Sequence, residues 1–307
     1  MAVREGITLT HYYNLVVQAL HSLTAKWRSH LPANAEMLPE LSRQEQIILN
    51  NAELMRENIT VDALRTVYPY APPERLRAVL DSFVRKGLLD DLTQGIYRFS
   101  PRMQRYIHDT QQALVSYTES ITAMPTEQAS RLAVLSVALI DKMSQGPNAI
   151  STPIFNLGCA NTVPSEYPLV QVQQRLICLM CYRDDAHIAA WRAEEYGPIG
   201  IRVASHLQAS SEAKTLQSFL QSPLFYDEAY VRAGLEELRL HGDLLDTGVG
   251  FALTAKGIVR RERVDSLTDE TFGSPFEQRL SDFGRKEWVM LISGLIDVTR
   301  ATKTLGT

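Results

Sequence analysis

The sequence lacks any hydrophobic run long enough to cross a membrane. Its most apolar stretch, residues 132–140, is interrupted by Ser136 and lies between Arg131 and Asp141. A membrane-spanning helix needs about 20 apolar residues, so this stretch predicts a buried helix instead. Residues 1–10 hold one arginine and one glutamate but no apolar core followed by a cleavage site, so we expect no secretory signal and no membrane partner.

Cysteine is scarce. The 307 residues include three, Cys159, Cys178 and Cys181, and such an odd count is a poor disulfide framework and is typical of the reducing cytoplasm. Cys178 and Cys181 are spaced C-x-x-C, but no second pair of cysteines or histidines follows at zinc-finger spacing. We interpret them as small residues on one face of a buried helix, because unpaired cysteine is among the most buried residue types. No metal or cofactor is predicted.

Motifs that bind phosphate groups or activate catalytic nucleophiles are also missing. The sequence has no P-loop, no dinucleotide-binding glycine motif, no H-E-x-x-H and no G-x-S-x-G. Residues 248–250 form an isolated G-x-G between two short apolar runs, which predicts a tight turn. We therefore expect a protein that is not an enzyme.

Positive charge is not in excess. Lysine and arginine number 31 against 35 aspartates and glutamates, so the formal net charge is −4, and contact with nucleic acid would require a local basic patch. The hydrophobic fraction of 45% and the charged fraction of 21% are typical of a globular protein. At about 150 residues per domain, the length indicates two domains.

Capping residues and glycines divide residues 41–122 into three helices, a two-stranded hairpin and an exit helix. The boundaries are marked in chain order by a Ser42–Glu45 capping box, Thr60, Pro72-Pro73, Gly87 and Ser100. The expected strands are residues 88–90 and 96–99. Three helices followed by a hairpin are the layout of a winged helix-turn-helix.

Residues 123–211 predict a helical middle domain. Helices are expected at about 127–143, 169–182, 186–195 and 198–209, with an irregular stretch of glycine and proline between the first two. Asp184 or Asp185 is expected to cap the third of these helices. At the two ends of the chain, we expect a helix to about His30 that starts at Thr8 or Thr10, and a last helix over about 275–299.

The order of the first segment returns in residues 212–272. Setting Gly87 against Gly242 places Leu80 on Leu235, Leu89 on Leu244 and, with one residue of slip in the turn, Phe99-Ser100 on Leu253-Thr254. Both copies read as an apolar helix, a glycine, two leucines, an aspartate, a turn, an apolar strand and a hydroxyl cap. The sequence thus predicts a mainly α protein with two small β-hairpins, as tandem winged-helix units around a helical middle domain.

Residues 235–270, LEELRLHGDLLDTGVGFALTAKGIVRRERVDSLTDE, resemble MarR-like winged-helix regulators. That family carries a Leu-Thr-x-x-Gly motif after the wing, which Leu253, Thr254 and Gly257 match. The first segment matches the family in layout only. The family wing often bears a cation near its tip, but the tips here, 92–95 and 247–250, contain none, which argues against DNA contact through the wings. The resemblance implies a DNA-binding transcriptional regulator.

Cations outnumber acids in the first segment. The predicted DNA-contacting residues are Arg65, Arg75, Arg77, Arg85, Lys86, Arg98 and Arg102. Arg75 and Arg77 stand near the start of the third helix, the end that enters the major groove in helix-turn-helix proteins. In the second segment, Arg232 and Arg239 are balanced by acids, so we expect a weaker contribution there. The alternative interpretation is that all these charges are solvated helix faces.

Residues 183–195 suggest a second kind of site. His187 and Trp191, with Asp184, are the candidate ligand-binding residues, and a metal-dependent enzyme is the rival function. This stretch faintly resembles a helix of DinB-like four-helix bundles, in which such a histidine can bind a metal. The plainer interpretation is that an aspartate caps the helix while His187 and Trp191, four residues apart, pack together.

The expected organisation has five parts: an N-terminal helix over 1–40, a first winged-helix domain over 41–122, a helical middle domain over 123–211, a second winged-helix domain over 212–272 and a C-terminal helix over 273–307. The predicted partners are double-stranded DNA and a small-molecule effector held by the middle domain. The terminal helices are apolar enough to form a homodimer. A scaffold that binds other proteins and no DNA is the remaining alternative.

Overall fold

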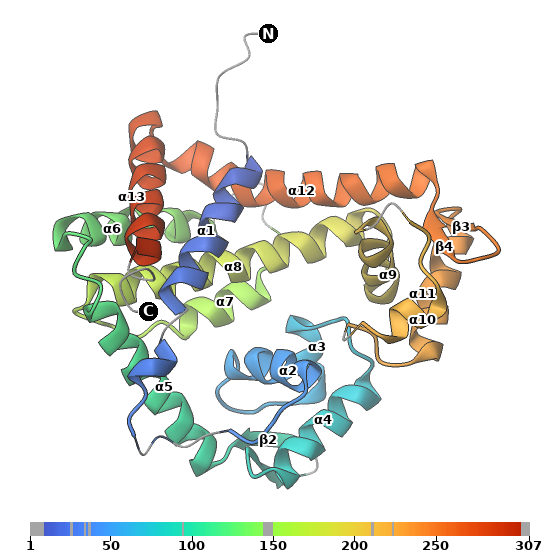
Figure 1. The fold of residues 1–307 in the computed structure, drawn as a ribbon, viewed down its shortest axis with the longest axis horizontal. Helices are drawn as coiled ribbons and strands as arrows, with labels where there is room; N and C mark the ends of the chain where they lie inside the picture. Colours follow the sequence, from blue (N-terminus) through green and yellow to red (C-terminus); the bar gives the residue numbers. More distant parts are fainter. Residues whose placement is uncertain are drawn as a thin grey trace.

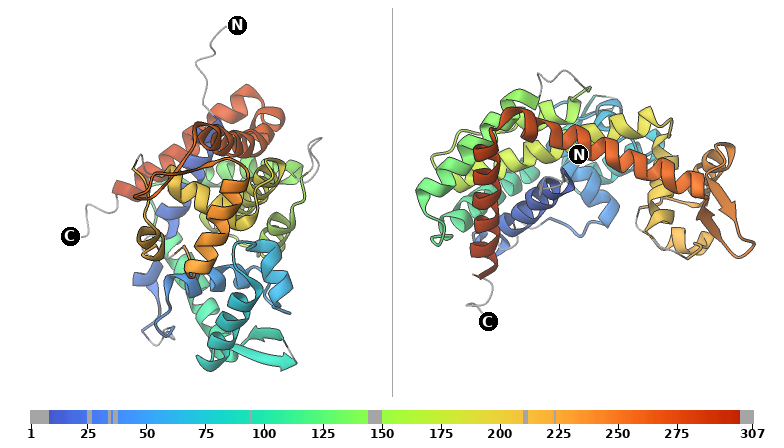
Figure 2. Two further views of the ribbon diagram at one scale, coloured as in Figure 1. Left: turned by 90° about the vertical axis from the view of Figure 1, so that its right-hand side faces the viewer. Right: turned by 90° about the horizontal axis from the view of Figure 1, so that it is seen from above.

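The chain is mainly helical and carries two antiparallel β-hairpins (Figure 1). The computed structural model describes residues 9–24, 27–33, 35, 38–93, 95–143, 150–209, 212–222 and 224–301. The hairpins project from different sides of the molecule, β1–β2 at the bottom of Figure 1 and β3–β4 at its right-hand edge (Figures 1 and 2). None of the described helices is long and apolar enough to cross a membrane.

The first segment has the predicted order of elements. It comprises α2 (Arg43–Glu53), α3 (Val61–Val67), α4 (Pro73–Arg85), β1 (Leu89–Thr93), β2 (Ile96–Phe99) and the exit helix α5 (Pro101–Glu119). The Ser42–Glu45 capping box forms, and the hydroxyl of Thr60 accepts the N–H of Ala63, so both predicted caps are confirmed. An isolated antiparallel β-bridge between Ile59 and Tyr97 adds one more pairing to the edge of the hairpin.

The second segment repeats this order. Residues 212–272 hold α10 (Leu216–Leu220), α11 (Glu228–Leu240), β3 (Leu244–Asp246), β4 (Phe251–Leu253) and most of the exit helix α12 (Ala255–Arg279). The remaining helix of this order is α9 (Pro198–Gln208), which was expected in the middle domain but packs on α11. A bridge between Lys214 and Phe251 takes the place of the bridge between Ile59 and Tyr97. Two hairpins that follow two helix-ending glycines were expected, and both are present.

The aligned glycines and hydroxyl caps make equivalent bonds in the two segments. Gly87 and Gly242 have φ values of 69° and 72°, the left-handed conformation that favours glycine. The hydroxyl of Ser100 donates to the carbonyl of Gly87 at 2.6 Å, and that of Thr254 donates to the carbonyl of Gly242 at 2.9 Å. Each hydroxyl also accepts a backbone N–H from the first turn of the exit helix that follows. One residue therefore joins the end of a helix, the hairpin and the next helix.

The middle of the chain differs from the prediction in two places. It comprises α6 (Thr126–Met143), α7 (Pro153–Ala160) and α8 (Pro168–Ala193). Helix α7 stands where an irregular stretch was expected, and α8 is one continuous helix where two were expected. Asp185 does not cap α8, because its carboxylate instead accepts the N–H groups of Ile154 at 3.3 Å and Phe155 at 2.8 Å. It thus caps the first turn of α7 from the middle of a neighbouring helix.

The terminal helices pack against each other inside one chain. They are α1 (Leu9–Thr24), followed by a short 3-10 turn η1 (Trp27–His30), and α13 (Asp282–Ala301). Pro275 was expected to start the last helix, but it lies inside α12, which ends at Arg279. Phe276 stacks on Tyr12 at 4.4 Å and meets Trp288 at 5.0 Å, so this packing outweighs the backbone bond that proline removes. Thr8, one of the two expected caps, lies outside the described residues.

The first prediction concerns Gly87. A Cβ at this position would meet nothing within 4 Å, so replacement by alanine introduces only backbone strain. We expect Gly87→Ala to lower the free energy of unfolding by about 1 kcal/mol. The control is Gly294→Ala in α13, where there is also open space but helical backbone, and where alanine should stabilise by about 0.5–1 kcal/mol. Urea denaturation measures both, and equal effects would contradict the prediction.

Candidate functional site

The exposed face of α4 follows from its apolar stripe. Leu76, Leu80 and Phe83 are fully buried, so the residues between them face outward. Arg77 and Arg85 are exposed, and no hydrogen bond or ion pair joins either of them to another described residue. Asp81 lies one turn from each and accepts a hydrogen bond from the hydroxyl of Tyr97 at 3.1 Å. Arg77 and Arg85 are thus the cations that α4 offers to an external phosphate.

Arg75, at the start of α4, instead contacts the second segment. Its guanidinium Nη2 lies 2.7 Å from Oδ2 of Asp227, and both side chains are 45% exposed. Asp227 also caps α11, because Oδ1 accepts the backbone N–H of Tyr230 at 2.8 Å. The bond from Arg75 and then that backbone N–H stabilise the carboxylate and lower the pKa of Asp227. The N-terminal ends of α4 and α11 therefore face each other across this ion pair.

Three more of the predicted cations have partners within the first segment. Lys86 Nζ lies 2.7 Å from Oε1 of Glu45. Burial raises the pKa of Glu45, but the bond from Lys86 and further hydrogen bonds outweigh it and bring the pKa to about 2. Arg98 Nε is 3.4 Å from Oδ2 of Asp90, and Arg102 donates to the carbonyl of Lys86 at 3.4 Å. These three side chains support the hairpin and the end of α4.

Arg65 is separate from the others. It lies on α3 and lines a cavity of about 400 Å³, together with residues of α8 that include Asp185 and Arg192. Of the seven predicted cations, the structure places Arg77 and Arg85 together on one unoccupied face.

The five arginines of residues 212–272 are paired with acids. The ion pairs are Arg232–Glu228, Arg239–Glu236, Arg260–Asp243, Arg261–Asp265 and Arg263–Glu194. The Asp243 carboxylate is fully buried, and Arg260 also stacks over the ring of Tyr196 at 4.1 Å. The basic stretch at the start of α12 thus serves contacts inside the chain.

A cluster of tyrosines around Arg202 joins the two segments. Arg202, on α9, donates to the hydroxyl of Tyr68 at 2.8 Å and lies over the rings of Tyr68 at 5.3 Å and Tyr70 at 4.8 Å. Tyr230 of α11 donates its hydroxyl to the carbonyl of Tyr70 at 2.5 Å. Burial raises the pKa of Tyr70 and of Tyr230 to about 12, so both phenols stay neutral. Sequence reasoning missed this cluster, because Tyr68-Pro69-Tyr70 resembles an ordinary turn.

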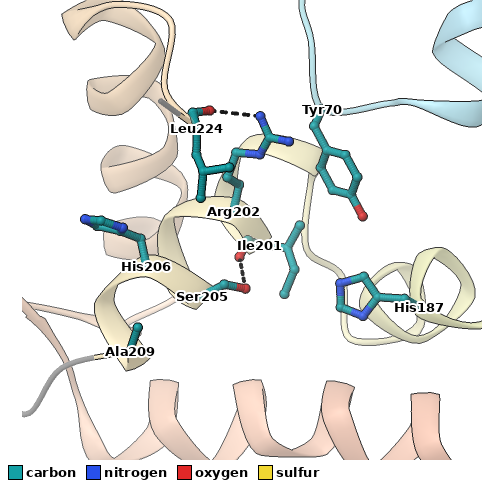
Figure 3. Close-up of a pocket in the computed structure, with 8 residues that line it drawn as sticks. All are labelled: Tyr70, His187, Ile201, Arg202, Ser205, His206, Ala209 and Leu224. Atoms are coloured by element: carbon teal, nitrogen blue, oxygen red, sulfur yellow. Dashed lines mark hydrogen bonds between the residues drawn. The ribbon is translucent and has the colours of Figure 1, made fainter. Parts of the chain in front are cut away.

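A pocket of about 280 Å³ opens beside this cluster, between the first segment, α8 and α9 (Figure 3). Tyr70 and His187 lie on one side of the view and Arg202, Ser205 and His206 on the other. The guanidinium of Arg202 also donates to the carbonyl of Leu224 at 2.9 Å. A fixed guanidinium, a neutral phenol and apolar walls suit a small ligand with one polar acceptor.

His187 is neutral in this pocket. Its Nδ1 lies 3.3 Å from the hydroxyl of Thr268, which itself donates to the carbonyl of Val264 at 2.7 Å. Because that hydroxyl proton is already used, Nδ1 carries the proton that His187 donates, which leaves Nε2 as an acceptor. Burial, then the nearby cations Arg261 and Arg183, lower the pKa of His187 to about 4.

The other two predicted ligand residues lie apart from the pocket wall. Trp191 is buried beside Tyr70, with 6.5 Å between ring centroids, while Asp184 is exposed on α8. Within the described residues, no three histidine, cysteine, aspartate or glutamate side chains are placed to hold a metal ion. Cys178 and Cys181 are buried on α8, as predicted.

The second prediction concerns the pH dependence of stability. The folded state holds His187 at a pKa near 4, below the ordinary value of 6.5, so protonation opposes folding as the pH falls through this window. Between pH 7.5 and 5.5 the wild type should lose about 1 kcal/mol more stability than His187→Gln. The exposed His11, as His11→Gln, is the control and should follow the wild type. Urea denaturation at several pH values measures this difference. If the stability of the wild type and of His187→Gln changed equally with pH, the prediction would be wrong.

One family comparison gives a match. A model described as a helix-turn-helix family matches residues 96–305. No curated protein and no solved structure matches the chain. The match supports helix-turn-helix architecture in general, and it confirms neither the MarR-like nor the DinB-like resemblance.

Proposed function

Since the chain belongs to this helix-turn-helix family, we propose that it is a DNA-binding transcriptional regulator built from tandem winged-helix units around a helical middle domain. The repeated order of three helices and a hairpin, with equivalent glycines and hydroxyl caps, supports the winged-helix assignment. The proposal assigns no catalytic activity to the protein. It includes the cytoplasmic location that the odd number of cysteines predicts.

The observation that carries the proposal is the unoccupied cationic face of α4. Arg77 and Arg85 are exposed on the third helix of the first unit, which is the recognition helix in helix-turn-helix proteins. The corresponding helix of the second unit pairs Arg232 and Arg239 with its own acids. Phosphate contacts dominate affinity for DNA, so we assign the primary contact to the first unit. Lys86, Arg98 and Arg102, at the end of α4 and the hairpin, are assigned secondary roles, and so is Arg65, which lies apart on α3.

The third prediction tests which unit binds. Arg77→Ala with Arg85→Ala should weaken binding to mixed duplex DNA and reduce the salt slope of log affinity by about one unit for each phosphate that is no longer neutralised. The matched control is Arg232→Ala with Arg239→Ala on α11, which should change affinity little because both cations are already paired. Fluorescence anisotropy at two salt concentrations measures both. If only the control variant binds more weakly, the second unit is the DNA-binding one.

The fourth prediction concerns Arg75. Its ion pair with Asp227 holds it against the second unit, so DNA must compete for this arginine. Asp227→Asn keeps a side-chain oxygen as the cap of α11 but removes the charge that holds Arg75. We expect Asp227→Asn to raise DNA affinity severalfold and to steepen the salt slope by about one unit. The increase should vanish when Arg75→Ala is added. Unchanged affinity in Asp227→Asn would exclude Arg75 as a contact.

The alternative function is that of a scaffold that binds proteins and not DNA. Two features support it. The N-terminal ends of α4 and α11 face each other, and the ion pairs of the second unit leave it little charge to offer DNA. Absence of binding to any duplex at low salt would favour this scaffold. The pocket beside Arg202 is proposed as the effector site of the regulator. A homodimer through the terminal helices would have to use faces other than those that pack α1 on α13.

A further inference from the structure

A third cavity, of about 370 Å³, lies between α5 and α8 and reaches the end of α2. Its walls are largely apolar or amide-bearing. They include Ile107, Leu114, Val170, Gln173 and Ile177. The volume lies in the range typical of small-molecule sites. Among the residues that line it, Glu53 is the one charged side chain and Tyr106 the only other titratable one.

The carboxylate of Glu53 has no partner in this cavity. No hydrogen bond or ion pair joins it to another residue in the described part of the chain. Burial raises the pKa of Glu53 to about 7, and no neighbouring charge offsets this cost. Glu53 also stands in the last turn of α2, which has no basic residue, and a negative charge is unfavourable at that end of a helix.

The surrounding polar groups are likewise uncommitted. The hydroxyl oxygen of Thr110, on the α5 wall, is buried without a hydrogen-bond partner among the described residues. Buried polar groups are normally bonded, and Thr110 lines the same cavity as Glu53, so both oxygens are available to a ligand. An amine that lies against Glu53 can donate to oxygen atoms but cannot accept from them. The ionised Glu53 carboxylate only accepts and the Thr110 hydroxyl can accept, so both oxygens suit an ammonium group.

We propose that this cavity binds a small lipophilic organic cation, with its ammonium group against Glu53 and its hydrocarbon part against Ile107, Leu114 and Ile177. Charge complementarity determines the class of ligand, because above its raised pKa the half-buried Glu53 carboxylate is paired by a cation, repels an anion and stays unpaired beside a neutral ligand. The site is distinct from the pocket beside Arg202, which has none of these lining residues. Because α2 belongs to the first unit and α8 to the middle domain, the bound cation would connect the two.

The fifth prediction uses three probes of one shape. 4-Phenylbutylammonium, 4-phenylbutanol and 4-phenylbutyrate differ in charge, and calorimetry at pH 8 on the full chain measures their binding without DNA. We expect the ammonium ion to bind at least tenfold more tightly than the alcohol, and the carboxylate not to bind. Glu53→Gln should reduce binding of the ammonium ion about tenfold and leave binding of the alcohol unchanged. Glu53→Asp, which keeps the charge, should retain part of the preference.

The matched control is Glu57→Gln, an exposed acid just beyond α2 that does not line the cavity. It should bind like the wild type. Thermal unfolding of Glu53→Gln checks that the variant folds, and it should not be less stable than the wild type at pH 8, because it removes a buried charge. No binding of the ammonium ion, equal binding of the alcohol, or full binding by Glu53→Gln would overturn the proposal. Because no DNA is present, such a failure is separate from failure of the proposed regulator.

Discussion

Burial of helix α8 on nearly all sides is the constraint on which the structure depends. Fourteen of its 26 residues are buried, and they are not confined to one stripe. A helix that is apolar around most of its circumference must be covered by others. Helices α1, α5, α6, α7 and α12 pack against it and thereby obtain their positions. Through α5 and α12, the exit helices of the two units, α8 also determines where both hairpins stand (Figure 1).

That arrangement turns the two units toward each other. Once α5 and α12 are attached to the same helix, the starts of α4 and α11 meet, and the intervening space is filled by the tyrosines around Arg202 and by the pair of Arg75 and Asp227. An exposed ion pair such as this contributes little to stability, typically under about 1 kcal/mol. It joins one cation of α4 to the second segment, although both side chains stay 45% exposed. A regulator of this design would gain DNA affinity by opening this contact.

Several acids that look unfavourable for DNA binding have structural roles. Glu237 of α11 accepts the N–H groups of Gly197 at 2.6 Å and Gly200 at 3.2 Å, and so caps α9. A Cβ on Gly200 would overlap that carboxylate, so a side chain there would displace Glu237 from this cap. Asp185 caps α7 in the same way from α8. An acid on α11 thus holds the start of α9.

Features that depend on neighbours in the chain could be predicted from the sequence. The caps at Ser42, Thr60, Ser100 and Thr254 each bond to a backbone N–H three residues away, so their residue types reveal the helix starts. The glycines at 87 and 242 mark the helix ends for the same local reason. The three helices and hairpin of the first segment, and two helices and the hairpin of the second, followed from these signals, as did the outward direction of Arg77.

Contacts between residues that are far apart in the sequence could not be predicted in this way. Arg75 and Asp227 are separated by 152 positions, and no local pattern pairs them. The continuation of α12 through Pro275 depends on Tyr12 and Trp288, which come from the two ends of the chain. Likewise, the sequence presents Glu53 as one more polar residue of an amphipathic helix, and only the packing of α5 and α8 around it creates the cavity. The sequence by itself thus determined the caps, the helix-ending glycines and the hairpins of the two repeated segments, because capping and periodicity act over a few residues, but it missed α7 and the continuity of α8 and α12. The tertiary structure alone decided which charges remain available to a ligand, because packing brings distant partners together.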